Sequence, residues 1–255
     1  MMTENLLLDS YLKRLKLATV ARNYTRLAEE AIANRAGYDE YLTCLLELEI
    51  ASRDQNMQRQ RLGRAGFPIM KTLEQFDFSA LPNLNQAQVL ELHRGSYLPE
   101  SFNVILVGSI GTGKTHLAIS LGAQACRTGH RVKYYTVAAL VTELLEAHDA
   151  HTLGRLKQSI AKVDLLILDE LGMVPFHQDA ANLLCQIINE RYERKSTIIT
   201  TNYPFQDWTQ FFGSQQLTAA LIDRLTHRCH IIEMNGDSYR LKESLKRKKK
   251  EKSAA

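Results

Sequence analysis

A glycine-rich segment, VILVGSIGTGKTHLAISLG over residues 104–122, has the residue types of a phosphate-binding loop. Gly108, Gly113, Lys114 and Thr115 fit the spacing G-x-x-x-x-G-K-[ST], and the segment joins an apolar run to a helix-like run. Glycines let successive main-chain N–H groups point at an anion, and the following helix adds its positive dipole end. The segment predicts a P-loop, and its alternative is a glycine-rich turn with a solvated lysine.

The positions of this loop predict how a ligand is held. The residues expected to contact the phosphates are Gly108, Ser109, Ile110, Gly111, Thr112, Gly113, Lys114, Thr115 and His116. Lys114 is expected to neutralise the outer phosphates, and the Thr115 hydroxyl is expected to bind Mg²⁺, which takes few protein oxygens. The loop therefore predicts a site for a nucleotide and its magnesium ion.

An acidic pair supplies the second half of this chemistry. Asp169 and Glu170 follow a four-residue apolar run, residues 165–168, within VDLLILDELG. At the end of a strand, Asp169 can hold the water shell of Mg²⁺, and Glu170 beside it can polarise an attacking water. The pair favours hydrolysis over binding alone, and its alternative is a buried strand that ends in a solvated acidic turn.

Three further polar residues are candidates for the same reaction. Asn202 ends the apolar run STIITTN, where its amide can contact the terminal phosphate or the lytic water; the alternative is a turn-forming Asn before Tyr-Pro. Arg224 lies at the end of a predicted helix, and Arg240 follows the last predicted strand. A guanidinium can stabilise a transferring phosphoryl group, and one donated by a neighbouring subunit makes hydrolysis depend on assembly. From the residues alone, helix capping or pairing with a carboxylate is the preferred explanation for each arginine.

Alternating strands and helices must position these residues. From residue 102 onward, the β-rich runs FNVILVG, RVKYYTV, DLLILDE, STIITTN and CHIIEM are separated by helical stretches at 115–128, 137–147, 179–194 and 217–227. This alternation predicts an α/β fold, a mostly parallel sheet sandwiched by helices, with ligands at the carboxyl ends of the strands. The P-loop, Asp169 and Asn202 fall at such ends, and we expect the Asn202 strand beside the P-loop strand.

The remaining segments predict the domain organisation. Residues 1 to about 62 follow a helical pattern, and a linker with glycine and proline breaks comes next. We place an all-helical domain at 1–70, the nucleotide-binding domain at 71–242 and a basic, disordered tail at 243–255. Phe76 and Phe78 in the linker either flank the base of a nucleotide or belong to the core. The tail either contacts nucleic acid or only aids solubility.

Composition and charge exclude several classes of protein. No apolar run approaches the roughly 18 residues that span a membrane, so we expect neither a membrane protein nor a secreted one. The four cysteines are far apart and form no C-x-x-C pair, which predicts neither a zinc site nor a disulfide framework. The net charge is +4, although residues 240–255 alone hold eight Lys or Arg and two Asp or Glu. We therefore expect a protein of the reducing cytoplasm whose basicity lies in its tail.

Taken together, these motifs resemble those of AAA+ ATPases of the DnaC and IstB type, most closely the IstB branch. The resemblance covers nearly the whole chain through GSIGTGKTHLA, LLILDELG, TTN, IDRL, DSYR and the linker GFPIMKTLEQFDF. Only about 15 residues follow Arg240, so we expect no C-terminal helical lid of the kind that most AAA+ proteins have, as the resemblance to this branch implies. The resemblance implies ATP as the nucleotide. It also implies Walker A roles for Lys114 and Thr115, Walker B roles for Asp169 and Glu170, sensor roles for Asn202 and Arg240, and a trans-acting finger at Arg224.

The resemblance also implies partners. IstB-like proteins are expected to form homo-oligomers on double-stranded DNA, to deform it, and to recruit or stimulate a transposase, here through the N-terminal helices. A helical insert before the Walker B strand carries Arg155, Lys157 and Lys162, which are candidates for phosphate contacts with DNA. A solvated helix face is the alternative for each of these cations.

Three other functions stay open at this point. A replicative helicase loader of the DnaC kind shares the ATPase core and differs in what the N-terminal module binds. A P-loop kinase for a small metabolite usually needs a lid and an acceptor pocket, and the sequence indicates neither. A non-hydrolysing, ATP-switched scaffold is the third, and Glu170 argues against it.

Overall fold

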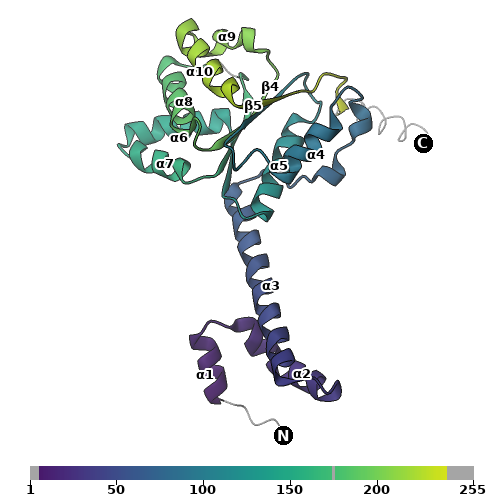
Figure 1. Ribbon diagram of the computed structural model, residues 1–255. Helices are drawn as coiled ribbons and strands as arrows, with labels where there is room; N and C mark the ends of the chain where they lie inside the picture. The colour runs from purple at the N-terminus through teal and green to yellow at the C-terminus, as the bar shows by residue number, and fades with distance from the viewer. Residues whose placement is uncertain (1–5, 174–175, 240–255) are drawn as a thin grey trace, which may run out of the picture. The chain divides into compact units, whose positions relative to one another are not determined.

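The computed structural model describes residues 6–173 and 176–239, and the chain divides into two compact units, Met1–Gln60 and Arg61–Ala255 (Figure 1). The division falls inside helix α3 (Tyr38–Ala65). Ala65 and Phe67 belong to the core of the second unit. The domain boundary near residue 70 and the tail at 243–255 stay predictions, and the tail lies outside the described residues.

The second unit is built on a parallel five-stranded sheet. Its strands are β1 (Asn103–Val107), β2 (Val132–Thr136), β3 (Leu165–Leu171), β4 (Ser196–Thr201) and β5 (Cys229–Glu233), in the order β2-β3-β4-β1-β5. Every neighbouring pair is parallel. The central strands β1 and β4 are buried on both sides because both faces of the sheet are covered. The predicted α/β class is confirmed.

Helices cover the two faces of this sheet (Figure 1). They are α4 (Gln86–Arg94), α5 (Lys114–Arg127), α6 (Val137–Asp149), α7 (Leu153–Ala161), α8 (Gln178–Arg191), α9 (Thr209–Phe212) and α10 (Gln215–His227), with short 3-10 turns η1 (Leu73–Gln75), η2 (Phe78–Ala80) and η3 (Phe205–Asp207). Alternate residues of β1 enter different cores: Val104 and Leu106 pack with α4 and α5, and Ile105 packs with α6, α8 and α10. This period of two is what a strand between two helical layers requires.

Strand register brings the predicted site residues to one edge. Val107 at the end of β1 pairs with Thr201 of β4, and Leu168 of β3 pairs with Ile199 of β4. The P-loop after β1 and Asn202 after β4 therefore emerge side by side, as expected for neighbouring strands. The β3–β4 register shifts between Leu168 and Leu171, and this irregularity falls on the acidic pair.

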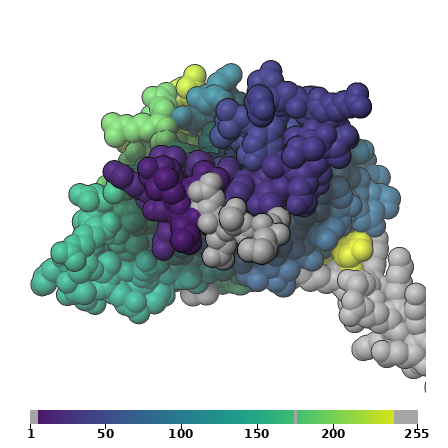
Figure 2. Space-filling view, turned by 90° about the horizontal axis from the view of Figure 1, so that it is seen from below, coloured from purple at the N-terminus to yellow at the C-terminus, as the bar shows by residue number. Residues whose placement is uncertain are grey.

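The N-terminal unit contains α1 (Leu6–Arg14), α2 (Ala18–Ala33) and most of α3, and it forms the purple and indigo surface in Figure 2. Its small core contains Leu12, Val20 and Leu45. Glu49 of α3 accepts hydrogen bonds from the main-chain N–H groups of Thr19 and Val20, which lack a partner within α2 at its first turn. The predicted helical character of this region is confirmed. Among the described residues, no helix has both the length and the apolarity that crossing a membrane requires.

Arg191, the last residue of α8, hydrogen-bonds to the segments that enter β3 and β4 at the amino-terminal edge of the sheet. The residue is 3% exposed, and its guanidinium donates to one hydroxyl and four main-chain carbonyls at 2.7–3.4 Å. The acceptors are Thr197 Oγ1 and the carbonyls of Ile160, Val163, Asp164 and Ser196. Burial lowers the pKa of Arg191 to about 10, so the group stays charged at neutral pH.

We expect Arg191→Leu to lower the free energy of unfolding by about 3 kcal/mol, because buried carbonyls lose their donor. Urea denaturation measures the loss. Arg194→Leu is the control, since Arg194 is exposed three residues later, and it should cost no more than about 0.5 kcal/mol. Equal losses in the two variants would contradict the bracing role of Arg191.

Candidate active site

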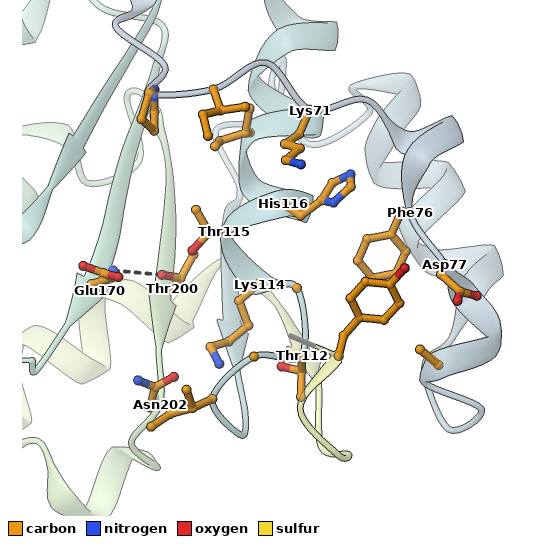
Figure 3. A pocket seen from close by; sticks show the side chains of 18 of the residues that line it. Lys71, Phe76, Asp77, Thr112, Lys114, Thr115, His116, Glu170, Thr200 and Asn202 are labelled. Carbon is orange, nitrogen blue, oxygen red and sulfur yellow. Dashed lines mark hydrogen bonds between the residues drawn. The ribbon is translucent and has the colours of Figure 1, made fainter. Parts of the chain in front are cut away.

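A cavity of about 370 Å³ opens at the carboxyl edge of the sheet, between the P-loop, the ends of β3 and β4, and the linker before α4 (Figure 3). Its lining includes seven of the nine predicted loop residues, Ile110 to His116, together with Glu170 and Asn202. Further lining residues are Pro68, Ile69, Lys71, Gln75, Phe76, Asp77, Ala80, Ile119, Met173, Thr200, Thr201 and Tyr239. The structure thus brings seven predicted loop residues, Glu170 of the acidic pair and the first sensor candidate Asn202 to one cavity.

The glycines of the P-loop are required by close packing. Gly108, Gly111 and Gly113 have φ of +152°, +82° and +92°, which side-chain-bearing residues rarely adopt. A Cβ at Gly108 would lie 2.2 Å from the carbonyl oxygen of Met234, and one at Gly113 would lie 2.8 Å from the Phe76 ring. Only glycine lets the main chain form this cradle, as the motif predicts.

Lys114 begins α5 and is 7% exposed. Its ammonium group donates to the carbonyl oxygens of Gly108 (2.8 Å) and Ser109 (2.6 Å). Thr112 closes the same turn by donating to the Ser109 carbonyl at 2.9 Å. The carbonyls of Gly108 and Ser109 thus stabilise the loop by accepting these hydrogen bonds. The ammonium group of Lys114 lies at the start of α5, where the helix dipole also favours an anion.

Asp169 lies behind the cavity, 1% exposed, and three hydroxyl groups donate to it. Thr115 and Thr200 donate to Oδ1, at 3.0 and 2.5 Å, and Tyr134 donates to Oδ2 at 2.6 Å. Burial, and then the hydrogen bond to Asp169, raise the pKa of Tyr134, so its hydroxyl keeps the proton that it donates. The carboxylate is therefore held in a fixed orientation beside Thr115.

Glu170, unlike Asp169, is exposed and lines the cavity. Its φ of +64° lies in the left-handed region, and its main-chain N–H donates to Thr200 Oγ1 at 2.9 Å (Figure 3). This local turn buries Asp169 while it exposes the adjacent carboxylate to the cavity. Non-glycine residues with positive φ cost energy and cluster at functional sites. The geometry gives the two acids of the pair separate positions, as the sequence motif predicts.

The linker forms the outer wall of the cavity. His116 on α5 is 2.8 Å from the Thr72 carbonyl through Nε2, and its ring packs edge-on against Phe76 at 5.4 Å. Phe76 is both a core residue and a wall of the cavity, and Phe78 packs against it at 5.0 Å. The core explanation for Phe76 is therefore confirmed, and its contact with the base of a nucleotide stays a prediction. The lining role of Lys71 was not predicted.

The roles predicted for the two arginines stay predictions. Arg224 of α10 does not line the cavity. The neighbouring carbonyl of Leu225 accepts from the Asn103 side chain at the start of β1, so Arg224 lies toward the opposite edge of the sheet. Arg240, the predicted second sensor, lies outside the described residues.

The predicted DNA-contacting cations differ in their surroundings. Lys157 donates to Glu190 of α8 at 2.7 Å and to Gln186 at 2.9 Å, so its charge is partly used within the fold. Arg155 and Lys162 are exposed. These latter two are the better candidates for contact with a polyanion.

Sequence reasoning missed two hydroxyls, of Tyr134 and Thr200, that hold Asp169. Thr200 carries a weak signal because it precedes Asn202 on the strand next to β3. Tyr134 carries none, because β2 meets β3 only in the folded sheet.

The residues present fit a magnesium nucleotide. A loop of main-chain N–H groups with a lysine suits phosphates, and the positive φ of Gly108, Gly111 and Gly113 lets the main chain form that loop. The Thr115 hydroxyl and the Asp169 carboxylate are hard oxygen ligands, and Mg²⁺ prefers such ligands. When bound, Mg²⁺ supplies charge neutralisation between the outer phosphates.

Comparison with known proteins identifies the family. The family model described as IstB-like ATP binding protein matches residues 10–247. A Pseudomonas aeruginosa protein, named for insertion sequence IS21 and ATP binding, is 39% identical over 239 residues, which cover 94% of this chain and 90% of the relative.

Two solved structures share the fold. AMPPCP-bound DnaA from Aquifex aeolicus has a TM-score of 0.56 at 23% identity, over 66% of this chain and 51% of the DnaA chain. The DnaC helicase loader has a TM-score of 0.52 at 23% identity, over 68% of this chain and 98% of the loader. The family match, the relative and the P-loop of an AAA+ fold agree, and the chain belongs to the IstB-like ATP binding proteins.

Proposed function

We propose that this protein hydrolyses ATP to ADP and phosphate and that the reaction depends on Mg²⁺. The observation that carries the proposal is the pair Asp169 and Glu170: one carboxylate is buried against the Thr115 hydroxyl, and the other faces the cavity of the P-loop. A protein that only binds ATP needs the loop and the lysine. A second carboxylate turned into the cavity is what proton abstraction from water requires.

Each group has a task in this reaction. The loop N–H groups and Lys114 bind the phosphate chain and stabilise the negative charge that spreads over its outer oxygens. Thr115 and Asp169 would hold Mg²⁺, directly and through its water shell. Glu170 accepts a proton from the attacking water. The oxygen of that water bonds to the γ-phosphorus, while the bond between this phosphorus and the oxygen that bridges to the β-phosphate breaks. Asn202 lines the same cavity and is placed to orient the water or the terminal phosphate.

We further propose that ATP turnover serves insertion-sequence transposition. The Pseudomonas aeruginosa relative is named for an insertion sequence, and this chain covers 90% of it. We infer that the protein forms homo-oligomers on double-stranded DNA and acts on a transposase. The likeness to the DnaC helicase loader is one of fold, so the transposase is the favoured partner.

The N-terminal unit supports a docking role. Leu6, Leu7, Tyr11 and Leu15 on and beside α1 are 52–73% exposed. Large apolar side chains that gather on a surface mark interaction sites in soluble proteins. We propose this surface for the transposase, and Arg155 and Lys162 for phosphates of the DNA.

The test measures phosphate release from ATP with purified full-length protein. We expect release to require Mg²⁺ and to rise severalfold when double-stranded DNA is added. No release under any condition would contradict hydrolysis. Strong turnover on a small metabolite with a flat response to DNA would favour the kinase alternative.

A separate binding experiment addresses the partner. Full-length protein with ATP and Mg²⁺ is immobilised and offered either a purified transposase or a purified hexameric helicase. We expect retention of the transposase alone, and we expect Leu7→Ser together with Tyr11→Ser to abolish it. Retention of the helicase alone would overturn the proposal in favour of a loader.

A further inference from the structure

We propose that Tyr134 is a positioning residue for the magnesium site. It acts by fixing the Asp169 carboxylate, and it does so without contacting the nucleotide. The inference rests on the proposed function, since a positioning role has meaning only if Asp169 serves Mg²⁺. Tyr134 does not line the cavity and belongs to no motif of the sequence.

The hydrogen bonds to Asp169 divide between its two oxygens. Oδ1 accepts from Thr115 and Thr200, which both belong to the cavity wall. Among residues 6–173 and 176–239, Oδ2 accepts from Tyr134 alone, at 2.6 Å. Rotation of the carboxylate about its Cβ–Cγ bond is resisted on the Oδ2 side by this one contact. Loss of the Tyr134 hydroxyl would therefore free Oδ2 while Thr115 and Thr200 still contact Oδ1.

The charge of Asp169 makes this contact important. In the described part of the chain, hydroxyl groups satisfy this 1% exposed carboxylate, and no lysine, arginine or histidine forms an ion pair with it. Neutral donors orient a carboxylate without cancelling its charge, which leaves that charge available to a cation. Partners outside the metal's own ligand set commonly change metal affinity by 10–100-fold when they are removed.

The ring of Tyr134 has a separate, structural role. It lies in the core with Val132 and Ile167, and it packs edge-on against Phe67 at 6.2 Å. Tyr134→Phe keeps these contacts and removes only the hydroxyl. The substitution therefore separates positioning of Asp169 from packing of the core.

The next residue provides a matched control. Tyr135 lies on the same strand but packs on the other face of the sheet, where burial and then the nearby Glu143 carboxylate raise the pKa of its hydroxyl. Neither Tyr135 nor Glu143 lines the cavity. Tyr135→Phe thus removes a tyrosine hydroxyl near a carboxylate at a site unrelated to magnesium.

The experiment follows binding of a fluorescent, non-hydrolysable ATP analogue to the full-length protein as Mg²⁺ is titrated. We expect Tyr134→Phe to raise the Mg²⁺ concentration at half-maximal binding about tenfold. Analogue affinity without Mg²⁺ should stay at the wild-type value. Tyr135→Phe should leave the Mg²⁺ titration unchanged, and thermal unfolding without ligands should respond similarly to both substitutions.

A double-mutant cycle with Asp169→Asn completes the test. In the Asp169→Asn background, Tyr134→Phe should have no further effect on the Mg²⁺ titration, since the carboxylate that it positions is gone. A wild-type titration in Tyr134→Phe, an equal shift in Tyr135→Phe, or full additivity with Asp169→Asn would each overturn the inference. If the unmutated protein binds the ATP analogue equally well with and without Mg²⁺, the proposed function is overturned, and the inference is overturned with it.

Discussion

Replacement of Glu170 by Gln is expected to lower the rate of ATP turnover by about 10²–10⁴-fold. The amide keeps the size of the side chain and cannot accept the proton of the attacking water. Glu170 lines the cavity and is exposed, whereas Asp169 is buried among hydroxyls, so the two acids do not substitute for each other. Affinity for ATP and Mg²⁺ should change little, because neither the loop nor the Asp169 carboxylate is altered. Phosphate release and analogue binding, measured on the same sample, separate the two effects.

Glu233→Gln is the control for this change. Glu233 is an exposed acid at the carboxyl end of β5, on the same edge of the sheet, and it does not line the cavity. We expect it to keep wild-type turnover. If turnover survives in Glu170→Gln, Glu170 is not the base. If turnover is undetectable in the unmutated protein while ATP still binds, the alternative of a non-hydrolysing scaffold gains support.

Glu170 also illustrates what the sequence can and cannot predict. The types and spacing of Lys114, Thr115, Asp169 and Glu170 predict their chemistry, because each motif is local and its geometry follows from a strand end or a helix start. The alternation of strands and helices likewise predicts a parallel sheet, which the structure confirms. The left-handed φ of Glu170, at +64°, cannot be predicted from the sequence, because glutamate does not favour that conformation.

Contacts between distant segments account for the rest. Tyr134 reaches Asp169 because β2 pairs with β3 in one register, in which Thr136 is opposite Asp169. The Thr72 carbonyl meets His116 only when the linker folds over α5. Neither contact follows from local periodicity, since both depend on how elements far apart in sequence pack. The auxiliary groups of the site are thus harder to predict than its reacting groups.

Arg224→Ala is expected to lower ATP turnover about a thousandfold, through a site that belongs to a neighbouring subunit. Within one chain, Arg224 lies toward the sheet edge opposite the cavity, and it is not among the lining residues. It cannot stabilise the phosphoryl group of its own site from there. In the proposed head-to-tail homo-oligomer, the Arg224 surface of one protomer would meet the nucleotide edge of the next. Nucleotide affinity should fall far less than turnover, because the arginine acts where charge develops during transfer.

Mixing two inactive variants tests donation between subunits. Lys114→Ala disables its own site and keeps the arginine, whereas Arg224→Ala keeps the site and lacks the arginine. An equimolar mixture should recover up to about a quarter of wild-type turnover, the fraction of interfaces at which an intact site meets an intact arginine. Each variant alone should stay inactive under the same conditions of DNA and Mg²⁺.

Arg228→Ala is the matched control, because Arg228 follows the same helix and is exposed. Its guanidinium donates to the Glu100 carbonyl at 3.4 Å and lies over the Phe102 ring, 5.3 Å from the ring centroid, at the edge of the sheet opposite the cavity. It should keep wild-type turnover, which shows that loss of positive charge at this end of α10 is not sufficient. An inactive mixture of Lys114→Ala and Arg224→Ala, with both variants still forming oligomers, would contradict donation in trans. Full turnover by Arg224→Ala as a monomer would remove the reason to link assembly with hydrolysis, since the cavity of one chain would then hold every group that the reaction needs.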